Sequence, residues 1–403
     1  MSESACPCLR PYLAAMQDQG DPRYFILWDK LGLAAEPIRV RAEEFVWLQQ
    51  FNGRRSLRDI QADTMLELGG HLLSLDLFTA LVVKLEEGLF LDGPRFRAKL
   101  ADPIRQPSCI GCYPAKPAAL RRQLKKYFTD GEGPGLPKGR KSDGALRAAL
   151  LPHIDYGRGG TTFAWGFKEV FERTDASLFV IIGTSHYSAN RFTLTRKDFL
   201  TPLGIAATDQ AYIDRMVAYY GDGLFDDEIS HLPEHSIELE VVFLQYLYEK
   251  KRAIRIVPLV VGPFQDCVET GLPPAAQNDI GRMVKALRKV EEETNEPICY
   301  LISGDLAHIG PKFGDPGPVQ EAFLKHSREK DQEILRQAEA ADPAGYFRVV
   351  AGEGDRRRIC GLPPTYTLLE AVLPSRGKVL HYDQYVHTEG LESVSFASVA
   401  FYR

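Results

Sequence analysis

The stretch LFVIIGTSHY, residues 178–187, decides the fold, because it begins as an unbroken apolar run and ends in Ser185 and His186. Such a run is typical of a strand that is buried on both faces of a sheet. Helical patterns separate most of the comparable apolar runs, which lie at residues 148–151, 254–261, 298–302, 379–382 and 394–401. This alternation predicts an α/β fold with a parallel or mixed sheet covered by helices.

Two other apolar runs end in the same way. His153 follows the run in AALLPHIDYGRGG, and Asp305 and His308 follow the run in CYLISGDLAHIG. Ligand sites of open α/β sheets form beyond the carboxyl ends of the strands. The repetition therefore predicts that these side chains and His186 line one crevice. The alternative is a chance grouping, because a single histidine is more often a hydrogen-bonded core or surface residue.

The segment PEHSIELEVVFLQYL places Glu234, His235 and Ser236 at the start of an amphipathic helix. Acidic and hydroxyl side chains cap helix N-termini, and that role alone would explain Glu234 or Ser236. It explains His235 poorly, because a protonated imidazole is disfavoured at the positive end of a helix dipole. We therefore expect Glu234 and His235 to join the crevice.

The segment RRRICGLPPTYTLLEAVL places Cys360 in a turn just before a further helix. The N–H donors of that helix, together with Arg357 and Arg358, predict that the thiolate of Cys360 is favoured. The thiolate is the form of cysteine that binds metals or acts as a nucleophile. From these residues alone, a plain buried thiol remains an alternative.

Gly157, Gly159 and Gly160 stand between His153 and the helical pattern FAWGFKEVF. A glycine-rich turn before a helix can bind phosphate, but this spacing matches neither the dinucleotide fingerprint nor a P-loop. We expect these glycines to let the backbone pass close to the crevice, and we do not expect a nucleotide site.

The composition excludes several classes of function. Hydrophobic residues make up 44% and charged residues 26% of the 403-residue chain, as in soluble globular proteins. The net charge of −5 argues against a nucleic-acid-binding surface. No apolar run approaches the roughly 18–20 residues of a transmembrane helix, and MSESACPCLRPYL has no signal-peptide pattern. We expect a cytoplasmic protein that binds neither nucleic acid nor membrane.

The chain has seven cysteines. The odd number, the size and the missing export signal argue against a disulfide framework, so we expect thiols. The CxxxCxxC pattern of radical-SAM proteins is absent. Cys109 and Cys112 form a C-x-x-C pair, which can be a redox or metal-binding element. Because the sequence has no second pair and no histidines next to this one, two unrelated thiols are the favoured interpretation. Cys6 and Cys8 give a still weaker signal.

The length suits two domains of unequal size. We expect a tail at residues 1–22, a small helical domain at 23–98, a connector at 99–145 and the α/β domain at 146–403. The connector carries a helical pattern at 118–128.

The small domain has the pattern of a winged-helix-like unit. Ser56 is the expected N-cap of its second helix. The predicted elements are a strand at 24–28, helices at 42–51, 57–65 and 75–87, and a strand at 89–91.

The small domain resembles a known family. FNGRRSLRDIQ, followed by LVVKLEEGLFLDGPRF, is similar to PqqD-like domains, which hold peptides or partners for radical-SAM maturation systems. The resemblance implies a docking domain. The alternative is an ordinary dimerisation or packing module. A DNA-binding winged helix is disfavoured, because the segment lacks a concentrated basic helix.

The α/β domain resembles the Memo family. PHxxYxxxG, GxSH, EHSIE, SGDLAH and ICG occur in that family's order and approximate spacing, with SGDLAH shifted by one residue from the family pattern S-D-x-x-H. The family is similar to class III extradiol dioxygenases of the LigB-like fold, which bind non-haem iron. Its bacterial members are called AmmeMemoRadiSam system protein B and accompany a radical-SAM protein and an AMMECR-type protein, which the resemblance implies as partners.

The resemblance implies a metal site with His153, His186 and Cys360 as ligands. It places Asp305 and His308 in the pocket, and it implies Fe(II), with Cu or Zn as alternatives. Extradiol dioxygenases have a carboxylate where this chain has a cysteine, and that softer ligand puts oxygen activation in doubt. A second departure is SCIGCYP, where the family usually shows H-A-G-x-x-Y-P.

Three functions fit these features. The first is an iron enzyme that modifies a small molecule or peptide with a radical-SAM partner, in which His308 handles protons, Asp305 orients it and Glu234–His235 is a second proton-handling pair. The second is a non-catalytic metal- or peptide-binding and docking component of the same system. The third is a zinc-dependent hydrolase with Glu234 as its base.

Overall fold

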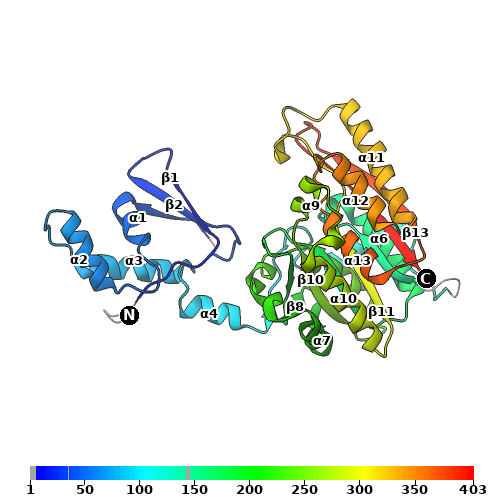
Figure 1. Ribbon diagram of the computed structural model, residues 1–403, viewed down its shortest axis with the longest axis horizontal. Helices are drawn as coiled ribbons and strands as arrows, with labels where there is room; N and C mark the ends of the chain where they lie inside the picture. Colours follow the sequence, from blue (N-terminus) through cyan, green and yellow to red (C-terminus); the bar gives the residue numbers. More distant parts are fainter. Residues whose placement is uncertain (1–5, 35, 142–145) are drawn as a thin grey trace. The chain divides into compact units, whose positions relative to one another are not determined.

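The computed structural model describes residues 6–34, 36–141 and 146–403, which form two compact units, Met1–Pro103 and Ile104–Arg403 (Figure 1). Each unit has a hydrophobic core of its own. Within these described ranges, no helix has the length and apolar character that a membrane span requires.

The first unit combines a small antiparallel sheet with short helices. The sheet has the order β1-β2-β3, with the bounds Leu13–Gln17, Tyr24–Asp29 and Ile38–Arg41. The helices α1 to α4 span Ala42–Leu48, Leu57–Glu67, Leu75–Glu87 and Pro94–Ala101. As expected, Ser56 caps α2, since its hydroxyl accepts the N–H of Asp59 at 3.2 Å. Trp47 stacks on Phe78 with ring centroids 4.2 Å apart, which joins α1 to α3 in the core.

The first unit differs from the sequence-based expectation in three places. Residues 13–17, expected in a terminal tail, form β1, because they pair with β2 in antiparallel register. The helix expected at 42–51 ends at Leu48. Residues 89–91 form no strand, and Leu91 makes only an isolated bridge to Leu9. The first difference comes from a hairpin between neighbouring segments and the third from a bridge to a distant one.

The second unit is built on a large mixed sheet. Its strands β4 to β14 span Ile104–Arg105, Leu146–Leu151, Leu178–Thr184, Phe192–Leu194, Asp198–Thr201, Gly204–Thr208, Arg255–Val261, Ile298–Ser303, His308–Ile309, Arg376–Val386 and Ser393–Tyr402. The strand order is β12-β14-β5-β11-β6-β10-β9-β8-β4, with β13 paired to β14 and β7 to β10. The neighbours β5, β11, β6 and β10 are parallel. The predicted mixed sheet is therefore confirmed.

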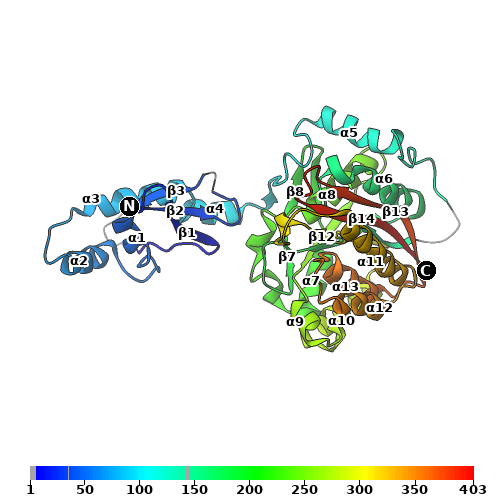
Figure 2. The same ribbon diagram turned by 90° about the horizontal axis from the view of Figure 1, so that it is seen from above.

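Helices cover both faces of this sheet (Figure 2). They are α5 to α13, spanning Pro117–Thr129, Tyr156–Arg173, Gln210–Tyr220, Ser236–Tyr248, Gln265–Thr270, Asn278–Glu293, Glu321–Glu339, Pro343–Gly352 and Leu362–Val372. Side chains of α5, α6 and α8 pack into one core, and those of α7, α10, α12 and α13 pack into the other. In β6, Val180 enters one core and Ile181 the other, because successive side chains of a strand point to opposite faces.

Residues 104–141, expected in the connector, contain β4 and α5. β4 pairs with β8, and α5 buries Leu120, Leu124 and Phe128 in the core of the second unit. The boundary between the units therefore lies between Pro103 and Ile104, and the proline-rich stretch after it is part of the second unit.

Candidate metal centre

The carboxyl ends of three parallel neighbours, β5, β11 and β6, carry the chemistry-bearing side chains. His153, Asp305 and His186 each lie two residues beyond the end of their strand. Because the three strands are adjacent and parallel, their ends meet at one edge of the sheet. The topology thus brings together residues that lie up to about half the domain apart in sequence.

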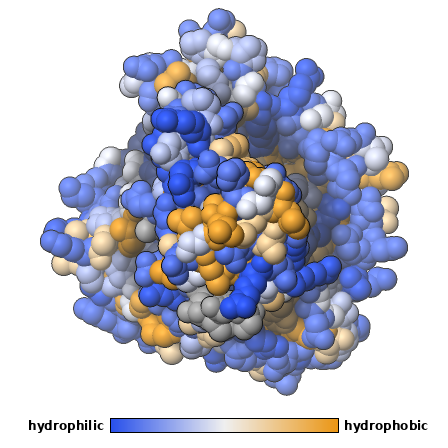
Figure 3. Space-filling model, turned by 90° about the vertical axis from the view of Figure 1, so that its left-hand side faces the viewer, coloured by the Kyte–Doolittle hydropathy of each residue, from blue (hydrophilic) through white to orange (hydrophobic). Residues whose placement is uncertain are grey.

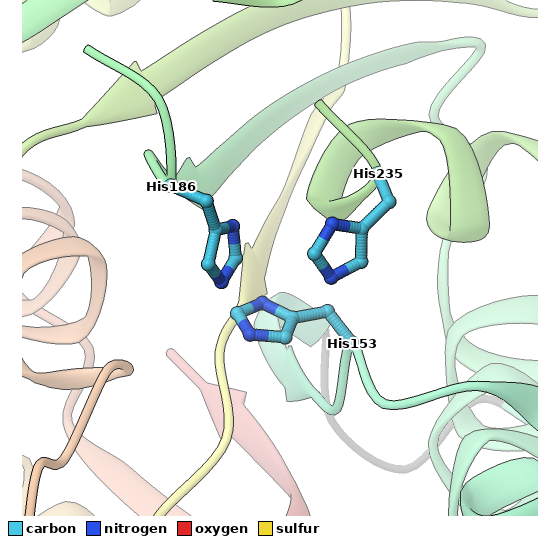
Figure 4. Close-up of side chains that lie close together, drawn as sticks. All are labelled: His153, His186 and His235. Atoms are coloured by element: carbon cyan, nitrogen blue, oxygen red, sulfur yellow. The ribbon is translucent and has the colours of Figure 1, made fainter. Parts of the chain in front are cut away.

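Three imidazoles face one another at this edge (Figure 4). His153 follows β5, His186 follows β6, and His235 immediately precedes α8. One nitrogen from each ring lies within 4.8 Å of the others. The sequence predicted His153 and His186 as metal ligands and His235 as a neighbour. The structure groups all three imidazoles.

The carboxylate of Glu234 contacts two of these rings. Its Oε1 lies 2.9 Å from Nδ1 of His186 and 3.4 Å from Nδ1 of His235. Its oxygens also accept the backbone N–H groups of His186 at 2.8 Å and Ser236 at 3.0 Å. A carboxylate at Nδ1 fixes the tautomer and leaves Nε2 as the free donor atom. The arrangement therefore orients His186 and His235 for a ligand at Nε2.

Electrostatics at the cluster follow from burial. Burial raises the pKa of Glu234, but the adjacent His186 and His235 outweigh this and hold that pKa well below its usual range. Burial lowers the pKa of His186, but the Glu234 carboxylate outweighs it and raises that pKa. Burial, followed by the neighbouring His186, lowers the pKa of His153 well below its usual value and that of His235 to about 4. His153 and His235 are therefore neutral at pH 7, as metal ligands must be.

His153 is fixed by the end of β11. Its Nδ1 lies 3.3 Å from the carbonyl oxygen of Ser303, and its backbone N–H donates to Oδ1 of Asp305 at 3.0 Å. Its Nε2 lies 3.2 Å from Sγ of Cys360. The structure therefore places Cys360 beside the cluster, next to His153. The Ser303 carbonyl had no signal in the sequence, because any residue supplies that group.

The expectation that Cys360 is a thiolate is wrong. Burial, and then the carboxyl of Asp305, raises the pKa of Cys360 well above its usual value. The two arginines pair elsewhere: Arg357 with Asp331 at 2.5 Å, and Arg358 with Asp315 at 2.6 Å. α13 also begins Leu362-Pro363-Pro364, and prolines have no N–H to offer a thiolate. Burial at this position therefore favours the thiol form of the side chain.

Asp305 and His308 lie at the edge but do not form the expected pair. The Asp305 carboxyl contacts His153, and burial raises its pKa to about 7. Nδ1 of His308 lies 3.2 Å from the carbonyl of Leu306 and 3.1 Å from that of Arg358. His308 is thus oriented by two backbone carbonyls. Burial lowers its pKa to about 4, so the ring is neutral.

A close approach of two glycines positions Asp305 and Cys360. A Cβ on Gly304 would lie 2.5 Å from Cα of Gly361, closer than any side chain tolerates. The two backbones therefore touch where β11 ends and α13 begins. The sequence reasoning missed this pair, although each glycine directly flanks a predicted site residue.

The glycines expected to pass close to the crevice have another role. Gly159 and Gly160 lie inside α6. A Cβ on Gly159 would lie 2.3 Å from the side chain of Ile154, and one on Gly160 would lie 2.5 Å from the ring of Tyr127. They therefore allow α6 to pack closely on its neighbours, and that expectation is corrected.

A cavity of about 370 Å³ opens onto the cluster. Its wall contains all three histidines of the cluster together with Asp305 and His308. The wall is completed by Cys109, Cys112, Ile154, Asp155, Arg158, Lys312, Phe313, Glu392 and Val394. A second, more apolar cavity of about 240 Å³ reaches His186 and Cys360 from the side of α9 and α13.

Cys109 and Cys112 correct a further expectation. The sequence favoured two unrelated thiols, but the structure joins the pair in a disulfide with Cα atoms 5.4 Å apart. Both residues are half-buried and line the histidine cavity. Histidines do lie near this C-x-x-C pair in the fold. They follow β5 and β6 and precede α8, so they are distant from the pair in sequence. Cys6 is exposed and Cys8 is half-buried.

These features define a class: a mixed α/β protein with an imidazole-lined pocket beyond the carboxyl ends of its parallel strands. The chain belongs to the Memo-like protein family, whose sequence pattern matches residues 105–400. The resemblance drawn from the sequence motifs is confirmed at this level.

Relatives carry the same family name. The MEMO1 family protein of Aquifex aeolicus is 25% identical over 400 residues, covering 96% of this chain and 98% of the relative. That of Methanopyrus kandleri is 28% identical over 311 residues, covering 74% of this chain and 99% of the relative. A crystal structure of an uncharacterized protein from Escherichia coli K12 is 15% identical and covers 63% of this chain and 99% of that one, with a TM-score of 0.37. A score this low carries no argument about the fold.

Proposed function

We propose that this Memo-like protein is a component of the type called AmmeMemoRadiSam system protein B, and that its histidine cluster binds one metal ion. Fe(II) is the proposed metal, with copper and zinc as alternatives. The site would serve a redox or modification pathway that acts on a small molecule or peptide, together with a radical-SAM protein and an AMMECR-type protein. The metal proposal rests on one observation: Glu234 contacts Nδ1 of both His186 and His235 and leaves their Nε2 atoms free.

The donor set fits a transition metal. Imidazole nitrogen is a ligand for iron, copper and zinc, whereas magnesium and calcium prefer oxygen. Bonds of about 2.1 Å bring ligand atoms to within about 4.2 Å of each other. The three imidazole nitrogens lie within 4.8 Å of one another, so small side-chain rotations suffice. We propose His153 and His186 as ligands, completed by Cys360 as the family resemblance implies or by His235.

A bound metal would supply an open position that polarises a substrate atom. The side chains of the protein would handle the protons and orient the ligands. With Nδ1–H donated to the carbonyls of Leu306 and Arg358, Nε2 of His308 is the nitrogen that can accept a proton from a substrate in the cavity. Glu234 is 1% exposed and would act on His186 and His235 rather than on substrate.

The test is elemental analysis after anaerobic purification and Fe(II) reconstitution, with Cys360→Ala and His235→Ala compared with wild type. We expect about one iron per chain in the wild type. Loss of iron in Cys360→Ala with retention in His235→Ala assigns the thiol as third ligand, and the reverse result assigns the third imidazole. An iron content below 0.1 per chain in reconstituted wild type, by this same assay, would overturn the metal proposal.

A non-catalytic docking role is the second candidate, and it would use the PqqD-like first unit to hold the radical-SAM protein. The observation that favours it is a group of exposed leucines at the end of α2, in the connection that follows it and in the first turn of α3: Leu66 (77% exposed), Leu68 (47%), Leu72 (88%) and Leu77 (42%). Figure 3 shows apolar residues gathered in a patch at the surface. Exposed apolar groups of this kind mark interaction sites more often than chance.

The docking role is tested by calorimetric titration of the purified radical-SAM protein into wild type and into Leu68→Glu/Leu72→Glu. Binding by the wild type and at least a tenfold weaker Kd in the variant are expected, because charges would have to be buried in the contact. Equal binding by both proteins contradicts the role. A zinc hydrolase is not proposed, since the intended base, Glu234, is buried and already shared by two imidazoles.

A further inference from the structure

The wall of the histidine cavity contains a feature that the proposed function does not use. Cys109 and Cys112 line the same 370 Å³ cavity as His153, His186 and His235. None of the other cysteines lines this cavity among the described residues, and Cys267 and Cys299 are fully buried in the cores. A sulfur pair that faces a cavity can meet a ligand, whereas a sulfur in a core cannot.

The turn that carries the pair holds the two sulfurs close together whether or not they are bonded. The N–H of Cys112 donates to the carbonyl of Cys109 at 2.9 Å, and the N–H of Gly111 donates to the carbonyl of Tyr113 at 3.1 Å. Gly111 has φ of +118°, which glycine adopts readily and other residues rarely do. These contacts are made by backbone atoms, so opening the S–S bond leaves them in place.

The turn is also tied to the elements that carry the histidines. Glu238 accepts the N–H groups of Ser108 at 2.9 Å and Cys109 at 3.2 Å, and it receives hydrogen bonds from Tyr113 and Arg105. Arg105 and Glu238 are fully buried. Glu238 lies on α8, one turn after His235. The pair therefore keeps its place beside the cluster through this network.

A structural role does not account for the disulfide. It closes a loop of only three residues in sequence separation. Loop-closure entropy grows with loop length, so a bond across such a short loop stabilises the fold less than a bond across a long loop would. The Glu238 network already anchors this turn. The remaining explanation for the disulfide is a chemical role at the wall of the cavity.

We propose that Cys109 and Cys112 form a redox-active pair that exchanges with small dithiols and disulfides entering the histidine cavity. In the exchange, a thiolate of the dithiol attacks one sulfur of the pair, the Cys109–Cys112 bond breaks and a mixed disulfide forms. The second thiol of the reagent then closes its own disulfide. Two electrons and two protons pass to the cysteines, which become thiols, and the dithiol is oxidised to a disulfide.

The exchange has a consequence for the cavity. In the dithiol state two sulfur donors face the space that the imidazoles face, and in the disulfide state they are lost as donors. Thiols are soft ligands, so the reduced protein offers an additional donor set to a soft or borderline metal. This consequence rests on the proposed metal site, whereas the exchange reaction does not.

The test is a redox titration of the full-length protein in buffers of reduced and oxidised dithiothreitol, with thiols counted by mass after alkylation. We expect two thiols per chain to appear and disappear in one reversible two-electron transition. Cys6→Ser/Cys8→Ser should keep this transition, and Cys109→Ser/Cys112→Ser should lose it. A pair that stays wholly oxidised or wholly reduced across the range overturns the proposal, as does a transition that survives in Cys109→Ser/Cys112→Ser.

A second measurement separates this proposal from the metal site. Co(II) is added to Cys360→Ser protein in each redox state, and the thiolate-to-cobalt charge-transfer band is recorded. We expect the band in the reduced state alone. Co(II) binding without the band in either state removes the consequence for the metal and leaves the titration to decide the exchange. Failure of Co(II) to bind to this variant in both states agrees with Cys360 as a ligand and removes the consequence for the metal, and a reversible titration would still uphold the exchange.

Discussion

The main sheet has one cavity at the amino ends of its strands and another at the carboxyl ends, and the two cavities differ in volume and in the side chains that line them. The cavity at the amino edge is the larger, at about 480 Å³, and is lined by charged residues such as Arg140, Arg147 and Glu296. Its charges pair with one another near solvent, as Arg140 does with Asp175, the two side chains being 63% and 46% exposed. The cavity at the carboxyl ends of the strands is smaller, but His153 is buried there, and the partly exposed rings of His186 and His235 share the buried carboxylate of Glu234.

This comparison shows that neither the volume of a cavity nor the number of charged side chains that line it identifies the candidate metal centre. Exposed ion pairs are screened and contribute little, whereas buried titratable groups keep shifted pKa values and a fixed geometry. Substitutions at the carboxyl edge should therefore change ligand binding strongly. Substitutions at the amino edge should change almost nothing.

The largest effect is expected from removing an imidazole of the cluster. His186→Ala should lower the affinity for Fe(II) by more than about 100-fold, because one of few ligands is lost and Glu234 is left buried without its main partner. Metal content after anaerobic dialysis measures this. His326→Ala, at a histidine 53% exposed on α11, is the matched control and should bind iron as the wild type does.

A smaller loss is expected from Glu234→Gln. The amide keeps the shape but offers one acceptor oxygen in place of two, so His186 and His235 are oriented less firmly. The affinity for Fe(II) should fall about 10–100-fold, as is usual when a carboxylate behind a metal-bound histidine is changed. Competition with a coloured chelator measures it. An unchanged affinity would mean that the shared carboxylate does not orient the ligands.

The close approach of Gly304 and Gly361 gives a stability prediction. In Gly361→Ala the new Cβ would lie 2.7 Å from the carbonyl oxygen of Asp305, so we expect a loss of about 1–3 kcal/mol in the free energy of unfolding. Urea denaturation measures it. Gly352→Ala is the control, because its Cβ would enter open space. Equal stability of the two variants would count against the contact.

Glu240 gives the pH-dependent prediction. It is fully buried, and burial raises its pKa well above the usual value, although a hydrogen bond with Ser303 acts in the opposite direction. Folding therefore takes up a proton, so this group's contribution to stability falls as pH rises above its unfolded pKa of about 4.3. Glu240→Gln should be more stable than wild type by about 1–3 kcal/mol at pH 8, with little difference at pH 4.

Denaturation of Glu240→Gln and wild type at both pH values checks this sign. Glu292→Gln, whose side chain is 63% exposed, should show no such difference. A gain in stability for Glu240→Gln that is largest at pH 4 would contradict the assignment of a buried, protonated carboxyl.

The smallest effect is expected at the amino edge. Arg140→Ala removes an exposed ion pair with Asp175 and should change stability by no more than about 0.5 kcal/mol, with iron binding unchanged. A large loss of iron in this variant would remove the distinction between the two edges.

The sequence predicted the long buried strands well, because an apolar run such as 178–182 carries its burial in its own composition. It did not predict the short strands β7, β8, β9 or β12. β7 and β12 pair with the distant strands β10 and β14, whereas β8 and β9 pair with each other and are joined to the sheet by β4 and β10. In the same way, the motif positions indicated His153 and His186 as site residues. The joining of His235 through Glu234 depends on how α8 meets β6, which no local pattern encodes.

The misjudged cysteines have the same cause. Arg357 and Arg358 lie within three residues of Cys360 in sequence, yet they pair with Asp331 and Asp315, which come from other segments. Adjacency in sequence thus gave the wrong protonation state for Cys360.

The most direct test of the central claim is anomalous diffraction at the iron edge from crystals grown anaerobically with Fe(II). We expect one peak per chain, bonded to His153 and His186 and to Cys360 or His235, at the carboxyl edge of the sheet. A fully occupied iron at any other place, or density at the cluster that excludes a metal while iron is present in the crystal, would contradict the account.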